Sequence, residues 1–357
     1  MTAAPLRVAI VGLGEAGATL HVPALAAVPS ASIVGACDTD LSRRKRVAER
    51  WKIRVFEDVG SMLREVRPEV VSIATPPESH AALCLEALGS GADVFCEKPF
   101  VCTVAEADRV IAAASAAGRS VAVNHEFREM PIFRAMIDAV RSGRDGELLF
   151  AQAWQQIDLP PWREQGWRGT LTRRTLFEAG VHLIDVLLAL FGEPPEAVRA
   201  STSSAGLDPD NRDALVVAIL EFSGGRMAVL TQNRLTKGEP QYFEARADVA
   251  RAAYRASFGG RARISAGLFR SSRPHMRIEY GAAGIAWREV GPRRRLLARN
   301  PTSPNVDATH RLITQVLDAF RGRRPPPSSA TEARQVLAVV EACYLSAETG
   351  RRVVIGS

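Results

Sequence analysis

A lysine and a histidine stand out in this sequence because their surroundings suit proton transfer. Lys98 is one of four lysines in a chain of 357 residues, and it closely follows a short apolar run, Asp93–Cys96. An ammonium group there could hold a substrate hydroxyl, stabilise a developing alkoxide and pass on a proton. The next residue, Pro99, disfavours helical geometry at Lys98 and lowers the cost of a cis peptide bond.

The histidine lies in a stretch with helical periodicity, Phe177–Phe191. On a regular helix Glu178, His182 and Asp185 would share one face, because they are spaced i, i+4 and i+7. Their neighbours are mostly apolar, so the pattern predicts a buried helix that carries three titratable groups. Such burial is unfavourable unless the groups are paired or functional. We favour an acid–base role for His182 over a purely structural one, in which the histidine would only make hydrogen bonds within the core.

A glycine-rich turn near the start of the chain predicts a dinucleotide site. The apolar run Val8–Val11 leads directly into it, as expected of a buried parallel strand followed by a helix. The first glycine allows a tight turn, the second allows a pyrophosphate to approach, and the third allows the helix to pack closely. We expect the cofactor to contact Gly12, Leu13, Gly14, Glu15, Ala16 and Gly17.

A second apolar run, Ser32–Cys37, ends in Asp38, which lies 21 residues beyond Gly17. Its carboxylate could accept hydrogen bonds from both hydroxyls of an adenosine ribose and would repel a 2′-phosphate, which favours NAD over NADP. Arg43 lies just downstream and could still receive such a phosphate, so NADP stays open. In the alternative interpretation, Asp38 only caps a helix over Leu41–Trp51.

Further apolar runs end in polar loops that belong beside the cofactor, because ligands of open parallel sheets bind outside the carboxyl ends of the strands. The run Val70–Ala74 leads to a loop with two prolines, and Ser120–Val123 leads to a polar segment that includes Arg128. The alternative for the first loop is an ordinary turn. The predicted cofactor contacts in these loops are Thr75, Pro76, Pro77, His80, Glu97, Lys98 and Asn124.

These elements predict an α/β fold with two domains. Residues 1–125 alternate strand and helix, which indicates a doubly wound parallel sheet of the Rossmann type. Residues 126–357 indicate an α+β domain with a large, mainly antiparallel sheet that leaves one face open. The predicted elements there are a helix over 131–143, strands over 148–156, 213–222, 227–233, 241–247, 252–258, 263–270, 276–281 and 285–290, and helices over 306–321 and 331–347.

Two tryptophan–arginine pairs lie in a polar loop between the predicted strand over 148–156 and the helical stretch Phe177–Phe191. Trp162-Arg163 and Trp167-Arg168 could stack on a sugar ring or hold an anion. Packing of the same residues over the face of the domain is an equally open alternative.

Composition limits the classes of function. The formal charge of +7 comes mainly from arginines spread through amphipathic segments, which favours a solvated surface with anionic ligands over nucleic-acid binding. The apolar runs are shorter than the ~20 residues of a membrane span. The N-terminus lacks the apolar core of a signal peptide, so we expect a cytoplasmic protein. The five cysteines lack metal-ligand spacing and indicate reduced thiols and no metal site.

Taken together, the motifs resemble those of the Gfo/Idh/MocA oxidoreductases, the family of glucose–fructose oxidoreductase and inositol dehydrogenase. The matching stretches are VGLGEAG at 11–17, ACD at 36–38, ATPPESH at 74–80, CEKP at 96–99, EAGVHLID at 178–185 and the tail at 331–353. The resemblance implies that His182 occupies the catalytic histidine position. In many members an aspartate lies four residues before that histidine, where this chain has Glu178. The glycine pair usual just upstream is replaced by Arg173-Arg174, which could fill space or bind an acidic substrate.

The resemblance implies hydride transfer between a nicotinamide and a secondary hydroxyl or ketone of a sugar, cyclitol or related polyol. His182 would take the hydroxyl proton, with Lys98 and Glu178 as its catalytic partners. Asp185, Arg128, Trp162 and Arg168 would bind or orient the substrate. Two alternatives stay open: transient sugar oxidation by tightly held NAD, and a non-catalytic protein that senses NAD or binds a partner. Members commonly form homodimers or homotetramers through the open sheet face.

Overall fold

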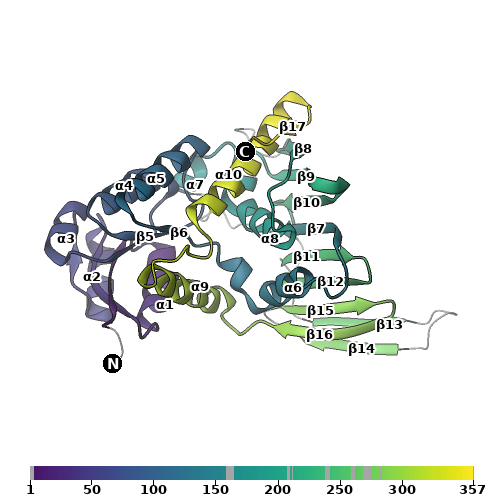
Figure 1. Cartoon of the computed structure of the whole chain (residues 1–357), viewed down its shortest axis with the longest axis horizontal. Coiled ribbons are helices and arrows are strands. Elements are labelled where there is room, and N and C mark those ends of the chain that lie inside the picture. The colour runs from purple at the N-terminus through teal and green to yellow at the C-terminus, as the bar shows by residue number, and fades with distance from the viewer. Residues whose placement is uncertain are drawn as a thin grey trace. The chain divides into compact units, whose positions relative to one another are not determined.

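The computed structural model describes residues 4–157, 165–206, 210, 212–237, 242–258, 262–267, 275–280 and 284–356, so Trp162 and Arg163 lie outside it (Figure 1). By packing, the chain forms two compact units. The first contains Met1–Glu129 and Asn305–Glu341, and the second contains Met130–Pro304 and Ala342–Ser357. The sequence predicted one domain from residue 126 onward, whereas residues 305–341 pack with the first unit.

A parallel sheet forms the centre of the first unit. Among the described residues it has six strands in the order β3-β2-β1-β4-β5-β6. The strand order reverses between β1 and β4, and such a reversal marks the crevice where open parallel sheets bind ligands. The predicted doubly wound sheet is therefore confirmed. Its strands are β1 (Leu6–Val11), β2 (Ala31–Cys37), β3 (Val55–Phe56), β4 (Val70–Ile73), β5 (Asp93–Cys96) and β6 (Val121–Val123).

Helices α3 and α5 of the first unit begin where the sequence supplies capping side chains. The Thr103 hydroxyl accepts a hydrogen bond from the Glu106 N–H at the start of α5, and Asp58 accepts one from the Ser61 N–H at the start of α3. The helices between the strands are α1 (Val22–Ala26), α2 (Leu41–Trp51), α3 (Val59–Val66), α4 (His80–Gly89) and α5 (Val104–Ala117).

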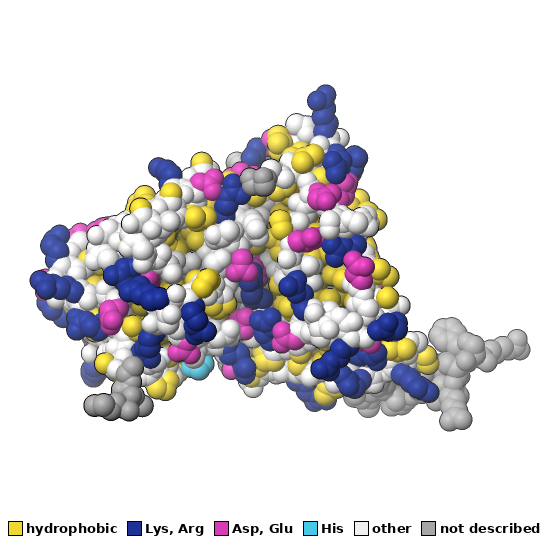
Figure 2. All heavy atoms as spheres, viewed as in Figure 1, with side chains coloured by type: hydrophobic (Ala, Val, Ile, Leu, Met, Phe, Trp, Pro, Cys, Tyr) yellow, Lys and Arg dark blue, Asp and Glu magenta, His cyan; other side chains and the backbone are white. Residues whose placement is uncertain are grey.

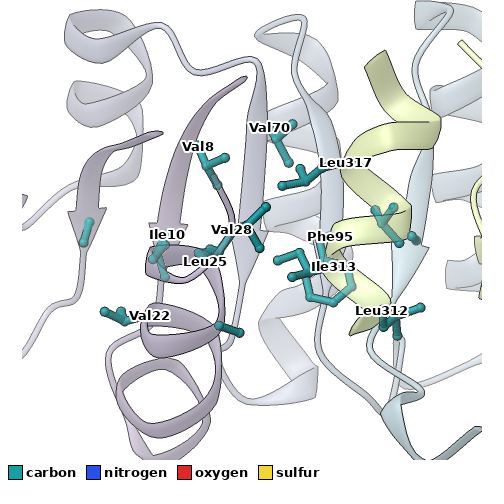
Figure 3. Packing of buried hydrophobic residues seen from close by; sticks show 14 of the residues in the cluster. Val8, Ile10, Val22, Leu25, Val28, Val70, Phe95, Leu312, Ile313 and Leu317 are labelled. Atoms are coloured by element: carbon teal, nitrogen blue, oxygen red, sulfur yellow. The ribbon is translucent and has the colours of Figure 1, made fainter. Parts of the chain in front are cut away.

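The core of this unit joins the sheet to a helix from the far end of the chain. In Figure 3, Leu317 of α9 (Pro304–Arg321) lies beside Val70, and Ile313 lies beside Phe95. All four side chains are almost wholly buried. Since apolar burial contributes about 25 cal/mol per Å², this helix adds substantially to the stability of the sheet. The first part of α10 (Ala330–Thr349) belongs to the same unit.

The second unit is built on a large mixed sheet. Its described strands follow the order β16-β15-β12-β11-β7-β10-β9-β8-β17, and all neighbours are antiparallel except β7 and β10. The predicted α+β architecture is thus confirmed. The strands are β7 (Leu148–Gln156), β8 (Ala197–Ser203), β9 (Leu215–Glu221), β10 (Met227–Asn233), β11 (Tyr242–Val249), β12 (Ala252–Phe258), β15 (Ile285–Val290), β16 (Arg293–Arg299) and β17 (Val353–Val354), with β13 (Ala262–Gly267) and β14 (His275–Tyr280) as a separate pair.

The two faces of this large sheet differ in burial. Helices α6 (Pro131–Arg141) and α8 (Val181–Phe191) pack on one face. Side chains alternate along β9, so that Val216 and Leu220 are buried while Val217 is 50% and Ile219 38% exposed. The second unit therefore has the open face that the sequence predicted.

Within the described part of the chain, no helix is long and apolar enough to cross a membrane. A cytoplasmic location stays a prediction. The described residues likewise contain no group of three or more histidine, cysteine or acidic side chains that could hold a metal ion.

Candidate functional site

The glycine turn after β1 has the geometry that its sequence predicted. Gly12 has a positive φ of +91°, and a Cβ on this residue would lie 2.6 Å from the carbonyl oxygen of Ala74. A Cβ on Gly17 would lie 1.9 Å from the Gly12 oxygen, so both glycines are required by close backbone approach. At Gly14, chain neighbours aside, the one described atom within 4 Å of such a Cβ is Nη1 of Arg43, at 3.8 Å. The turn therefore leaves space over Gly14, which fits the approach of a pyrophosphate.

The helical segment after this turn changes type along its length. It begins with a π-helical turn, Gly17–His21, and continues as α1 from Val22. Pro23 lies in the first turn of α1, where its missing N–H costs no helical hydrogen bond. Residues Leu13, Glu15 and Ala16 precede the π-helical turn.

Asp38 binds the glycine turn instead of capping the next helix. Its Oδ2 accepts a hydrogen bond from the Leu13 N–H at 2.7 Å, and its Oδ1 accepts one from the Asp40 N–H at 2.8 Å. Asp40 caps α2, since its side chain accepts from the N–H groups of Ser42 and Arg43. The capping interpretation of Asp38 is therefore wrong. The half-exposed Arg43 guanidinium lies 3.6 Å from Asp38 Oδ2, so the structure brings both predicted ribose-recognition residues together.

His80 ties two loops at the carboxyl ends of the strands. Its Nδ1 lies 3.0 Å from the carbonyl oxygens of Pro99 and Phe100, and its Nε2 lies 2.8 Å from that of Thr75. Burial lowers the pKa of His80 and outweighs these hydrogen bonds, which raise it. The ring is fully buried. His80 therefore positions the 75–80 and 98–100 loops and presents no exposed edge to a ligand. Thr75 and Pro76 of the same loop are accessible, whereas Pro77 is buried.

A buried ion pair lies directly behind Lys98. Glu97 Oε1 accepts hydrogen bonds from His21 Nε2 at 3.0 Å and from Asn124 Nδ2 at 2.7 Å, while Oε2 accepts the Lys98 N–H at 2.9 Å. Nδ1 of His21 lies 2.7 Å from the Ser72 hydroxyl. Burial alone would raise the pKa of Glu97, but the hydrogen bond and charge of His21, followed by the charge of Lys98 and the amide of Asn124, lower it below its ordinary value.

This network fixes the backbone of Lys98. The peptide bond from Lys98 to Pro99 is cis, and Lys98 is half-buried. The Glu97 and Asn124 side chains, both predicted to contact the cofactor, face each other inside the unit. Their hydrogen bonds hold the β5 and β6 ends together. Arg128 belongs to the same unit, where its Nη1 lies 3.0 Å from Glu332 of α10.

In the second unit, Glu178 is held between two arginines. Its Oε1 accepts a hydrogen bond from Arg168 Nε at 2.6 Å, and its Oε2 accepts one from Arg234 Nη1 at 2.9 Å. The Arg234 side chain is only 3% exposed. The Arg168 guanidinium also lies over the Trp167 ring, 4.5 Å from its centroid. Trp167 and Arg168 begin the short helix α7 (Trp167–Thr170) instead of lying in a loop, and Arg168 reaches the predicted site residue Glu178.

The helix that carries His182 is not regular throughout. Residues Thr175–Gly180 form a π-helical segment, and α8 begins at Val181. His182 and Asp185 are both buried on α8, as predicted, while Glu178 lies in the π-helical segment before it. Gly180 lies close to its neighbours, because a Cβ there would lie 2.7 Å from Gln232 Oε1 and would displace that side chain. The regular i, i+4, i+7 face therefore applies only to the last two residues.

The arginine pair that replaces the usual glycines makes contacts within its own unit. Arg174 is buried, its N–H donates to Asp213 Oδ1 at 2.6 Å and its Nε donates to the Asp213 carbonyl at 3.1 Å. Arg173 forms an ion pair with Glu348. Tyr344 donates its hydroxyl to Asp213 Oδ2 at 3.1 Å. These contacts favour the space-filling alternative for Arg173-Arg174 over substrate binding.

Sequence reasoning missed three residues that shape these sites: His21, Asp213 and Arg234. His21 is far in sequence from Glu97, and Arg234 is far from Glu178, so spacing carried no signal for either pair. The one signal for a special role of His21 was a histidine among apolar residues, two positions before Pro23.

The comparisons with known proteins agree with this geometry. Residues 6–125 match a family model described as "Oxidoreductase family, NAD-binding Rossmann fold", and residues 133–252 match "GFO/IDH/MocA C-terminal domain". This chain belongs to the Gfo/Idh/MocA family. The family membership makes it an oxidoreductase with an NAD-binding Rossmann fold, as the glycine turn predicted.

Several relatives of this Gfo/Idh/MocA protein have named activities. A D-apiose dehydrogenase from Paraburkholderia graminis is 25% identical over 94% of this chain and 86% of its own length. An inositol 2-dehydrogenase from Rubrobacter xylanophilus is 32% identical over 64% of this chain and 65% of its own length. A 1-carboxy-3-chloro-3,4-dihydroxycyclohexa-1,5-diene dehydrogenase from Comamonas testosteroni is 26% identical over 98% of this chain and 96% of its own.

Solved structures share the fold over nearly the whole chain. An oxidoreductase from Agrobacterium radiobacter in complex with NAD⁺, L-tartaric acid and magnesium superposes with a TM-score of 0.84 at 20% identity, covering 98% of both chains. An aldose-aldose oxidoreductase from Caulobacter crescentus superposes with a TM-score of 0.81 at 20% identity, covering 98% of this chain and 99% of its own.

Proposed function

We propose that this Gfo/Idh/MocA protein is an NAD-dependent dehydrogenase that acts on a secondary hydroxyl of a sugar, cyclitol or related polyol. The observation that carries the proposal is the anchoring of Lys98, whose backbone is held by a buried, fully hydrogen-bonded carboxylate at the carboxyl end of β5. A lysine whose position is fixed in this way suits contact with a reacting hydroxyl. The named substrates of the apiose and inositol enzymes support the substrate class.

The first unit would hold the cofactor through its glycine turn. Backbone around Gly14 would receive the pyrophosphate, and Asp38 would accept the ribose hydroxyls. The bound nicotinamide supplies the hydride acceptor for the reaction. Because the Asp38 carboxylate faces the turn and would repel a 2′-phosphate, we infer that NAD is the preferred cofactor. The nearby Arg43 guanidinium would reduce this repulsion and so allow some binding of NADP.

Proton transfer would fall to His182. In the oxidation direction His182 takes the hydroxyl proton as the carbon loses hydride, and the Lys98 ammonium stabilises the developing negative charge on oxygen. Glu178 would act through the two guanidinium groups that it holds, Arg168 and Arg234, and Asp185 would orient His182.

The decisive experiment follows the absorbance of reduced nicotinamide at about 340 nm. A panel of cyclitols, aldoses and sugar acids is tested as substrates, with NAD⁺ and NADP⁺ in turn. We expect Lys98→Ala or His182→Ala to lower kcat by about 10²–10⁴-fold while NADH affinity changes little. Lys45→Ala, on the exposed side of α2, is the matched control for loss of a lysine. Near-normal turnover in either site variant would disprove the assignment.

We further propose that the open sheet face forms a homodimer or homotetramer. Its support is the run of exposed apolar side chains on adjacent strands, Val217 and Ile219 of β9 and Met227 of β10. Light scattering after gel filtration measures the oligomer mass. Ile219→Asp should reduce that mass, and an unchanged mass at micromolar concentration would argue against this face.

A further inference from the structure

A cavity lined by arginines lies in the second unit, apart from the residues discussed so far. Its volume is about 430 Å³, and it is lined by Arg251, Arg288 and the three consecutive arginines Arg293–Arg295, with Asp145 as the one acidic lining residue described. The cavity is formed by the β15–β16 hairpin, the start of β12 and the turn that follows α6. Figure 2 shows lysine and arginine side chains gathered over the region that β15 and β16 occupy in Figure 1.

The charges in this cavity are only partly compensated. Arg288 donates two hydrogen bonds to Asp145, one of them from Nε at 2.5 Å, and the Tyr254 hydroxyl donates to the same carboxylate. Arg294 pairs with Glu289 at 2.7 Å. Within the described residues, Arg251, Arg293 and Arg295 have no ion pair. Arg251 donates only to a carbonyl oxygen, that of Arg144, at 2.6 Å.

The register of the hairpin makes this arrangement unfavourable without a ligand. Arg288 of β15 lies directly opposite Arg295 of β16 in the ladder. Like charges placed opposite one another on neighbouring strands destabilise the pair. One carboxylate, on Asp145, cannot neutralise both guanidinium groups and two further arginines. A multivalent anion in the cavity would remove this repulsion.

We propose that this cavity binds a small phosphoryl anion, such as a phosphate monoester or pyrophosphate group. Guanidinium groups pair with phosphoryl oxygens through two parallel hydrogen bonds, and several arginines around one concavity can hold a group of two or more negative charges. The volume suits a ligand of small-molecule size.

The test is isothermal titration of the whole chain with pyrophosphate in about 0.15 M salt, where exposed charges are screened beyond ~8 Å. Saturating NAD⁺ is present throughout, so that the glycine turn is occupied and does not bind the probe. We expect saturable binding that the double variant R293A/R295A weakens at least tenfold. The control K45A/R46A removes the same charge from exposed positions of α2 and should change the affinity less than twofold.

A third variant gives a change of opposite sign that damage to the fold would not imitate. Asp145→Asn removes the negative charge that competes with the ligand for Arg288, so pyrophosphate should bind more tightly. Absence of saturable binding, equal weakening by both double variants, or weaker binding by Asp145→Asn would each overturn the proposal. Circular dichroism of the variants confirms that each one is folded.

Discussion

Substitution of Glu97 by glutamine tests the buried ion pair behind Lys98. The amide has nearly the same size as the carboxylate, so packing is kept and the charge is lost. Glu97 accepts hydrogen bonds from His21, Asn124 and the Lys98 N–H, and an amide cannot accept all three in the same geometry. Removal of one member of a buried ion pair costs about 3–5 kcal/mol. We expect a decrease of about 3 kcal/mol in the free energy of unfolding at pH 7.

The pH dependence gives the prediction its sign. The pKa of Glu97 is lowered in the folded protein, so its contribution is fully present above the pKa of the unfolded chain, about 4.3. That contribution is lost progressively as the pH falls toward the lower folded pKa, because the unfolded chain then binds a proton that the folded chain does not. The difference in free energy of unfolding between wild type and Glu97→Gln should therefore be constant from about pH 6 to 7, where ordinary carboxylates are ionised. It should shrink below pH ~4.

Urea unfolding followed by circular dichroism at a series of pH values measures both effects. Glu49→Gln, an exposed carboxylate on α2, is the control and should change stability by less than about 0.5 kcal/mol. A double-mutant cycle with His21→Gln then isolates the coupling between the two side chains. If Glu97→Gln has wild-type stability at pH 7, or its deficit stays constant down to pH 3.5 (about one unit below the ordinary glutamate pKa), the reasoning about this pair is refuted.

Four further substitutions probe the cofactor turn and the Glu178 contacts. Gly17→Ala should abolish NADH binding measured by fluorescence, because its Cβ would overlap the Gly12 oxygen. Gly14→Ala should fold normally and lose only affinity for NADH. Equal behaviour of the two variants would contradict the assigned roles. Arg43→Ala should lower kcat/KM with NADP⁺ more than with NAD⁺, and an unchanged ratio would remove Arg43 from 2′-phosphate recognition. Glu178→Gln should lower kcat about tenfold or more because the two arginines lose their shared carboxylate, and kinetics at wild-type level would show that this contact is structural only.

Local signals in the sequence predicted much of the fold. The strand Asp93–Cys96 and the helix start at Thr103 follow from an apolar run and a capping hydroxyl, both of which act over a few residues. The sequence does not distinguish Asp38 from Asp40 as the cap of α2, because both have the same side chain. Only the hydrogen bonds in the structure separate them: Asp40 caps α2, and Asp38 accepts the Leu13 N–H.

Contacts between distant segments could not be predicted in the same way. The Arg234 partner of Glu178 and the His21 partner of Glu97 come from other elements, and nothing in their local sequence identifies the pairing. The sequence predicts a regular helix over Phe177–Phe191, whereas its first residues belong to the π-helical segment Thr175–Gly180. An apolar pattern does not distinguish the extra residue per turn of a π-helix. Packing of α9 on the first sheet depends in turn on complementary apolar surfaces that only the folded chain brings together.

The return of α9 to the first unit has a consequence for the order of synthesis. A ribosome releases the N-terminal strands long before residues 305–341, yet Phe95 and Val70 are covered by Ile313 and Leu317 of that late segment. Until the last part of the chain emerges, the nascent sheet has an uncovered apolar surface of the kind that chaperones bind. A chain that stops before residue 305 would carry this apolar surface permanently, so we expect such a fragment to aggregate more readily than the full chain.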